Sequence, residues 1–292
     1  MTDWHREWGP EGLGAWTPYR VDGTGNRFAL IDALDGGSAD AFIHAGPEWA
    51  RGLTASDSPW RSAEGRPMDG LILLLPPQGE GDLRMVIFNA DGSRPEACGN
   101  ALRCLVRVAF DMGRVGRPRF VVETDAGSRA VDALEAQGPA TRVSMGPPRL
   151  IRGRVEIEVN GRTVSGVSIS MGNPHFVVDL NSVTDGDVSA IGAAISIHPE
   201  FPQGTNVEFL FGDVVRPRVR VWERGVGETE ACGSGACAVA HSLYGSSLIH
   251  KPLRLDLPGG ELLVGRDTHG LWLEGFATWE PVGHSSREGA KR

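Results

Sequence analysis

Two cysteines, Cys98 and Cys232, each stand directly before a glycine and an apolar stretch, in "ACGNALRCLVRVAF" and "ACGSGACAVA". A thiol at the start of a helix faces unpaired backbone N–H groups and the positive end of the peptide dipoles. Both favour the thiolate, so we expect the pKa of each thiol to lie below its free value of about 8.5. The neighbouring glycines let backbone donors approach an anion, so a carboxylate is expected beside each sulfur.

Three other interpretations of these cysteines stay open. They could be ordinary buried residues beside turn glycines. Zinc binding would use the pairs Cys98/Cys104 and Cys232/Cys237, but helical spacing separates each pair, and only the second fits the usual two- to four-residue knuckle. A cysteine hydrolase with His175 as base would leave one thiol unexplained.

Two opposed thiols solve a specific chemical problem. Inverting a carbon that bears hydrogen requires one group to remove the proton from one face and another to deliver a proton to the opposite face. A thiolate and a thiol across a cleft do this, and they exchange roles in the reverse reaction. The duplicated cysteine motif therefore favours racemisation or epimerisation.

The elements around the motifs predict two similar α+β domains that face each other. Two helices begin at the cysteines, with apolar positions at helical spacing and stops at Gly113 and Gly245. We place Arg103 and Arg107 on the polar side of the first helix. Glycine and proline near 138–148 indicate a hinge. Alternating or aliphatic patterns predict strands at 71–77, 83–92, 119–127, 154–161, 167–180, 206–213, 217–225, 253–265 and 270–279.

Composition narrows the class of protein. The 292 residues carry a net charge of −8, and the only lysines are Lys251 and Lys291, so nucleic acid is not expected as a partner. The first residues lack the apolar centre of a signal peptide, and the longest aliphatic run, 71–75, is too short for a bilayer. We expect a cytoplasmic protein without membrane contact. Four cysteines do not make a disulfide scaffold.

The two signatures "NADGSRPEACGNALRC" and "ERGVGETEACGSGACA" resemble the diaminopimelate epimerase family, and the resemblance runs from about Gly23 to Trp279. It implies an α+β fold of two pseudo-symmetric domains, each a curved, mainly antiparallel sheet around a central helix, with the active site in the cleft between them. The N-terminal domain would cover 1–140, completed by 279–292, and the C-terminal domain 141–278.

The resemblance also implies an activity: interconversion of L,L- and meso-diaminopimelate without pyridoxal phosphate, another cofactor or a metal, in lysine and cell-wall precursor biosynthesis. The enzyme would be a homodimer. Cys98 and Cys232 would be the acid/base thiols, and Arg224 would bind the far carboxylate. His175 and Asp69 would support the site. The remaining substrate-binding residues would be Asn26, Asn89, Gly99, Asn100, Asn173, Asn206, Glu223, Gly233 and Ser234.

Two departures keep the substrate open. The family usually has Asp where this chain has Arg27, and the stretch 54–70 matches its pattern poorly although it keeps Asp69. A racemase of another amino acid, for example histidine, is the alternative on the same fold. A binding protein without catalysis would have no use for two thiols at anion-binding helix starts.

Overall fold

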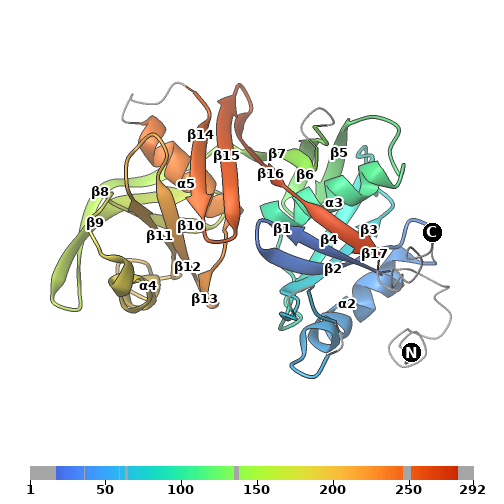
Figure 1. The fold of residues 1–292 in the computed structure, drawn as a ribbon, viewed down its shortest axis with the longest axis horizontal. Coiled ribbons are helices and arrows are strands. Elements are labelled where there is room, and N and C mark those ends of the chain that lie inside the picture. Colours follow the sequence, from blue (N-terminus) through green and yellow to red (C-terminus); the bar gives the residue numbers. More distant parts are fainter. Residues whose placement is uncertain are drawn as a thin grey trace, which may run out of the picture.

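The computed structural model describes residues 18–35, 37–58, 60–62, 65–134, 138–245 and 251–281. The chain forms two halves that lie side by side (Figure 1). The first half contains β1 (Pro18–Gly23), β2 (Asn26–Asp32), α2 (Ala39–Thr54), β3 (Gly70–Leu75), β4 (Leu83–Asn89), α3 (Gly99–Asp111), β5 (Arg119–Thr124), β6 (Gly127–Asp132) and β7 (Ala140–Gly146). The second contains β8 (Arg149–Val159), β9 (Arg162–Ser170), β10 (Pro174–Val178), η2 (Asp185–Asp187), α4 (Val188–Ser196), β11 (Asn206–Phe211), β12 (Arg218–Glu223), β13 (Gly227–Thr229), α5 (Gly233–Tyr244), β14 (Leu253–Leu257), β15 (Gly260–Asp267) and β16 (Gly270–Phe276). Strand β17 (Thr278–Pro281) returns to pair with β1.

The two halves share one topology. Strands β2 and β3 pair in parallel around the crossover helix α2, and β10 and β11 do so around α4. Strand β4 then pairs in parallel with β5 after α3, as β12 does with β14 after α5. The other sheet contacts are antiparallel. The predicted α+β fold of two similar, mainly antiparallel units is therefore confirmed.

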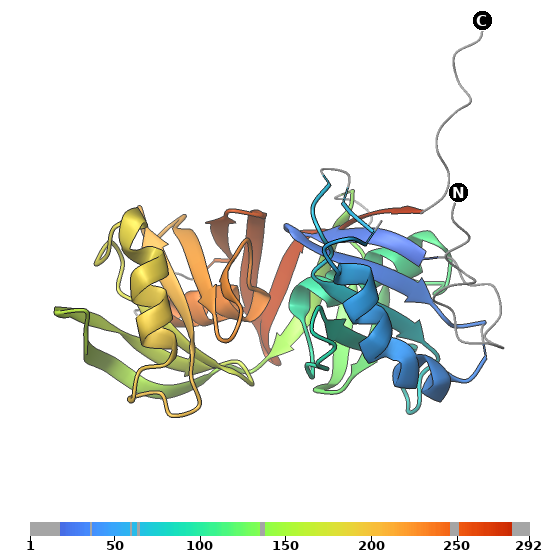
Figure 2. The same ribbon diagram turned by 90° about the horizontal axis from the view of Figure 1, so that it is seen from below.

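Each sheet is covered on both faces. In the first half, Leu71 and Leu73 of β3 pack toward α2, whereas Ile72 and Leu74 join the core around α3. This explains the unbroken aliphatic run, because a strand buried on both faces has no polar side. Figure 2 shows α2 and α4 in front of the sheets of their own halves.

The central helices α3 and α5 share one apolar core. Helix α3 is buried nearly all round, and Arg103 and Arg107 are 0% and 6% exposed. Their predicted place on a polar face is wrong, because the sheet wraps the whole helix. Both helices end as predicted, next to Gly113 and at Gly245.

Some predicted elements differ. The stretches 167–180 and 253–265, each expected as one strand, are hairpins formed by β9 with β10 and by β14 with β15. Helices α2 and α4 were not predicted. The expected hinge at 138–148 holds β7, which pairs with β6 in its own half and with β16, so the halves are joined by paired strands (Figure 1). The domain boundary at 140/141 stays a prediction, and residues 1–17 and 282–292 lie outside the described residues.

No helix in the described ranges is long and apolar enough to cross a membrane.

Candidate active site

The two helix starts meet at the centre of the molecule. Cys98 and Cys232 are the N-cap residues of α3 and α5, both with extended backbone. A Cβ placed on Gly233 would lie 3.6 Å from the Cα of Gly99 and 2.8 Å from Leu273. The two glycines therefore allow the helix starts to come close together, and the motifs 134 residues apart form one site.

Side-chain amides tie the two motifs to each other. Asn100 donates from Nδ2 to the backbone oxygen of Ala231, at 3.2 Å, and to the side chain of Asn26. Asn26 also hydrogen-bonds Asp69, whose Oδ2 accepts from the backbone N–H of Arg27 at 2.8 Å. Burial raises the pKa of the Asp69 carboxyl, and hydrogen bonding to Arg27 opposes that shift.

A second chain of contacts ends at the sulfur of Cys232. Ser234 Oγ lies 3.4 Å from that sulfur and accepts from Asn173 Nδ2 at 3.4 Å. Asn173 Oδ1 lies 3.0 Å from Nε2 of His175, and Nδ1 of the same ring lies 2.6 Å from Glu208 Oε1. This series connects a buried carboxylate with the thiol.

Strand geometry explains why these polar side chains point inward. His175 shares a face of β10 with Val177, and Glu208 shares a face of β11 with Leu210; both apolar residues belong to the central core. The carboxylate of Glu208 fits because residue 235 in the first turn of α5 is glycine: a Cβ there would lie 2.6 Å from Glu208 Oε1. Glu208 was not recognised from the sequence, although a charged residue inside the apolar strand "NVEFLF" is a signal for such a site.

Burial dominates the electrostatics of both thiols. It raises the pKa of Cys98, with opposition from the N–H of Ala101, and raises that of Cys232 well above its ordinary value. The negative charge of Glu223 raises both further. The expectation that the helix starts would lower these pKa values is wrong, because loss of solvation outweighs the helix N–H groups.

Glu223 is the carboxylate whose negative charge raises the pKa of both thiols. It ends β12, and its Oε1 accepts from Thr229 Oγ1 at 2.6 Å. Burial raises the pKa of Glu223, and the bond from Thr229 lowers it. Its charge acts on both thiols, and its predicted role in substrate binding stays a prediction.

The remaining predicted residues lie at the ends of strands. Asn206 begins β11, donates to the oxygen of Pro174 at 3.1 Å and accepts from the backbone N–H of Arg224 at 2.9 Å. The guanidinium of Arg224 donates to the oxygen of Gln203 at 2.6 Å. Asn89 ends β4 and its side chain donates to Ser93 at 2.9 Å, and no hydrogen bond among the described residues joins that side chain to the cysteine motifs.

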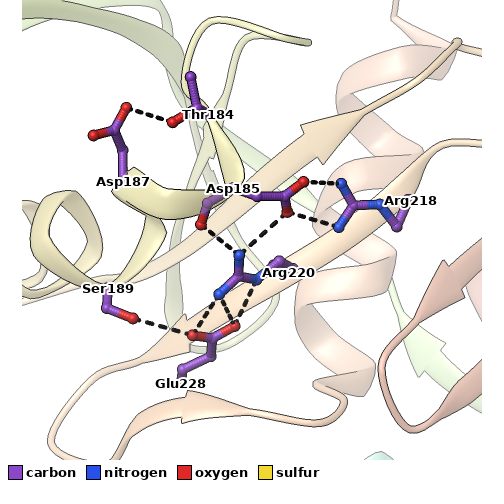
Figure 3. Close-up of polar contacts among 7 residues, drawn as sticks. All are labelled: Thr184, Asp185, Asp187, Ser189, Arg218, Arg220 and Glu228. Atoms are coloured by element: carbon purple, nitrogen blue, oxygen red, sulfur yellow. Dashed lines mark hydrogen bonds and ion pairs between the residues drawn. The ribbon is translucent and has the colours of Figure 1, made fainter.

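The hairpin that carries Glu223, Arg224 and Thr229 is braced from outside. Arg220 donates to Glu228 at 2.6 and 2.8 Å and to the backbone oxygen of Asp185 at 2.6 Å, as Figure 3 shows. Arg218 holds the carboxylate of the same Asp185 at 2.6 and 2.8 Å, and Ser189 donates to Glu228. These contacts fix the hairpin to η2 and the start of α4.

Comparison with known proteins gives consistent matches. The family model described as diaminopimelate epimerase matches residues 21–151 and 167–274. The chain is 37% identical over 259 residues to the diaminopimelate epimerase of Stutzerimonas stutzeri (strain A1501), covering 84% of this chain and 89% of that protein. It is 40% identical over 265 residues to that of Cyanothece sp. (strain PCC 7425 / ATCC 29141), covering 84% and 90%.

Solved structures share the fold at low identity. A hydroxyproline epimerase from Agrobacterium vitis with bound trans-4-hydroxy-L-proline superposes with a TM-score of 0.67 and 16% identity, over 94% of this chain and 92% of that one. A predicted epimerase from Pseudomonas aeruginosa gives a TM-score of 0.65 at 16% identity, over 91% and 99%. These likenesses show the two-unit α+β fold.

Proposed function

The chain belongs to the diaminopimelate epimerase family and is an isomerase that interconverts stereoisomers of diaminopimelate, and on this premise we propose that Cys98 and Cys232 are its two bases. The observation that carries the proposal is the meeting of the two helix starts, each capped by a cysteine, with Glu223 close to both thiols.

Proton transfer between the two sulfurs balances without a cofactor. The thiolate of one cysteine takes the α-proton and becomes a thiol, and the electron pair of the broken C–H bond is delocalised into the α-carboxylate. The other thiol then gives its proton to the opposite face of the carbon and becomes a thiolate. The number of protons on the pair is unchanged, and the reverse reaction restores the first state.

The backbone N–H groups at the two helix starts support this step. The first N–H groups of α3 and α5 have no carbonyl partner within their own helices. The N–H of Ala101 acts on the sulfur of Cys98 and that of Gly235 on the sulfur of Cys232, so these helix starts can stabilise a thiolate and a carboxylate held beside it. Negative charge that develops on the carboxylate would be stabilised there. Asn100 and Ser234 are proposed as the side-chain donors beside these N–H groups.

We propose the other predicted site residues as binding groups for the rest of the substrate. Arg224, at an exposed hairpin turn, suits a bidentate contact with the far carboxylate. Asn26, Asn89, Asn173 and Asn206 can each donate and accept, as the amino and carboxylate groups of a diamino diacid require. We also propose that the enzyme is a cytoplasmic homodimer; light scattering of the purified full chain measures its oligomeric state.

Solvent-deuterium incorporation tests the reaction. In D₂O, with no added cofactor, L,L-diaminopimelate should acquire deuterium at the α-carbon while the meso isomer forms. Cys98→Ser and Cys232→Ser should each lower kcat by about 10²- to 10⁴-fold, because an alcohol is a much weaker acid than a thiol. Wild-type inversion by either variant would contradict the two-thiol proposal. Deuterium exchange into another amino acid, and none into diaminopimelate, would show that the substrate is a different amino acid. The two-thiol mechanism would still stand.

A further inference from the structure

Glu230 forms ion pairs with two arginines from the other half of the molecule. Arg27 Nη2 lies 3.0 Å from Glu230 Oε2, and Arg66 Nη1 pairs with Oε1 of the same carboxylate. The side chain of Arg27 is only 7% exposed. Arg27 lies in β2 and Arg66 shortly before β3, whereas Glu230 precedes α5 of the second half. The group formed by Glu230, Arg27 and Arg66 is called the Glu230 clamp below.

Backbone atoms also pack closely around Glu230, where the two halves meet. Gly259, in the turn between β14 and β15, donates from its N–H to the oxygen of Glu230 at 2.9 Å. A Cβ on Gly259 would lie 2.2 Å from the oxygen of Thr24, and a Cβ on Gly25 would lie 2.4 Å from Glu230 Oε2. The turn between β1 and β2 therefore fits against Glu230 with no room for another atom.

This joint connects directly with the residues at both helix starts. Glu230 is two residues before Cys232 in the chain. On the other side, Arg27 follows Asn26, whose side chain binds Asn100 in the first turn of α3. A movement of Arg27 relative to Glu230 would thus shift the start of α3 relative to that of α5.

We propose that Glu230, held by Arg27 and Arg66, is a positioning residue that sets the two thiols at the distance needed for proton transfer. The inference rests on the roles proposed above for Cys98 and Cys232. None of the three clamp residues is needed to touch the substrate. The clamp acts through geometry, because each sulfur must reach an opposite face of the same carbon. Two further carboxylates face this arginine: Asp22, 3.8 Å from Arg27 Nε, and Asp69, which accepts from the Arg27 backbone N–H at 2.8 Å.

Two substitutions loosen the clamp in the full-length enzyme. Arg27→Met keeps much of the side-chain volume and removes the charge, and Glu230→Gln keeps the shape. Each should lower kcat by about tenfold or more and change KM much less, because displacing a reacting group by about 1 Å can cost up to 10²-fold. Arg27→Lys should keep most of kcat. Arg20→Met is the matched control, because Arg20 pairs with Glu280 at 3.4 Å within the first half, at an exposed site.

Cross-linking reports the thiol separation without substrate. Dibromobimane, which joins two nearby thiols, should link Cys98 to Cys232 in the wild type and in Arg20→Met. It should do so several-fold more slowly in Arg27→Met and Glu230→Gln. Wild-type kcat and cross-linking in these two variants would overturn the proposal, and so would a loss of kcat with unchanged cross-linking. An enzyme that cross-links as expected but fails to epimerise diaminopimelate would contradict the proposed function and support the clamp.

Two glycine-to-alanine variants distinguish an effect on the clamp from an effect of backbone strain alone. Gly25 and Gly113 both have positive φ, +85° and +67°, but a Cβ on Gly113 would meet nothing within 4 Å. Both alanine variants therefore suffer the same kind of backbone strain, and only Gly25→Ala pushes against Glu230. Gly25→Ala should slow cross-linking and lower kcat, whereas Gly113→Ala should affect neither. Equal behaviour of the two variants would overturn the proposal.

Discussion

Glu208 Oε1 lies 2.6 Å from Nδ1 of His175, and neither side chain has any exposed surface. Buried polar groups need hydrogen-bond partners, and each of these two side chains supplies one for the other. Because an amide oxygen can only accept, Nε2 of the ring carries the proton in its contact with Oδ1 of Asn173. That proton can be donated to Oδ1 of Asn173, which leaves the amide nitrogen of Asn173 to donate to Ser234, beside the sulfur of Cys232.

Removing Glu208 should therefore destabilise the protein strongly. In Glu208→Ala, buried His175 loses its partner, and we expect the free energy of unfolding to fall by about 3–5 kcal/mol. Glu208→Gln should cost less, because the amide can keep a hydrogen bond to Nδ1. Urea unfolding at pH 7 measures both. Glu280→Ala, which breaks the exposed pair with Arg20, should cost only about 0–1 kcal/mol. Equal costs for Glu208→Ala and Glu280→Ala would contradict the buried-pair interpretation.

Glu223→Gln should make both active-site thiols more acidic. The negative charge of Glu223 raises the pKa of Cys98 and of Cys232, so its removal lowers both values and increases the thiolate fraction at any pH below them. Alkylation by iodoacetamide, followed at each cysteine by mass spectrometry between pH 7 and 10, should reach half its maximum at a lower pH in the variant. Glu200→Gln, an exposed carboxylate paired with Arg152, is the control. A shift to higher pH, or none, would show that this charge does not act on the thiols.

The sequence predicted the two central helices well because their signals are local. The cysteine–glycine starts and the glycine stops lie at the two ends of each helix in the sequence, so the residues that pack against the helix need not be known. Helix α2 escaped prediction because Gly46 and Pro47 stand in its middle, where such residues usually end a helix. Gly46 is there for packing: a Cβ would lie 2.1 Å from the ring of Phe88.

The site shows the same division between local and long-range information. The signatures are local, and the structure brings both of their cysteines together with Asn100, Ser234 and Glu223. Glu208, Glu230 and Arg103 were missed because their roles depend on partners far away in the chain. The partner of Arg27, for example, lies 203 residues away, so the charge at that position could be read only as a departure from the family pattern.

Arg220→Met should weaken substrate binding through the hairpin that carries Arg224. Arg220 links Glu228 of that hairpin to Asp185, so its loss frees the turn while leaving Arg224 itself in place (Figure 3). We expect KM for diaminopimelate to rise by roughly three- to tenfold, since a partly ordered arginine loses about 1 kcal/mol of binding free energy to ordering. Arg216→Met removes a similar arginine, which pairs with Asp256 at 2.8 Å and precedes β12, at the end of that strand opposite to Arg224. A similar rise in KM in both variants would contradict a specific brace.

Arg103→Met tests whether a buried charge serves the first thiol. The Arg103 side chain is fully buried and donates to Thr24 Oγ1 at 2.7 Å, while its Nε and Nη1 have no hydrogen-bond partner among the described residues. A buried charge with so few hydrogen bonds lowers the stability of the protein. We therefore expect Arg103→Met, an apolar side chain of similar length, to have a free energy of unfolding within about 1 kcal/mol of the wild type or above it. Arg103→Ala should instead lower it by about 2–5 kcal/mol, because a cavity remains.

The charge of Arg103 acts on the first thiol, because it lowers the pKa of Cys98 and so opposes part of the effect of burial. Its loss should raise that pKa further, so iodoacetamide should alkylate Cys98 more slowly at pH 8 in Arg103→Met. Cys232, whose pKa is governed by burial, Glu223 and Glu208, should react as before. A stable Arg103→Met enzyme with wild-type reactivity at Cys98 would leave the arginine without this role, whereas slower alkylation of Cys98 alone would assign its charge to the first thiol.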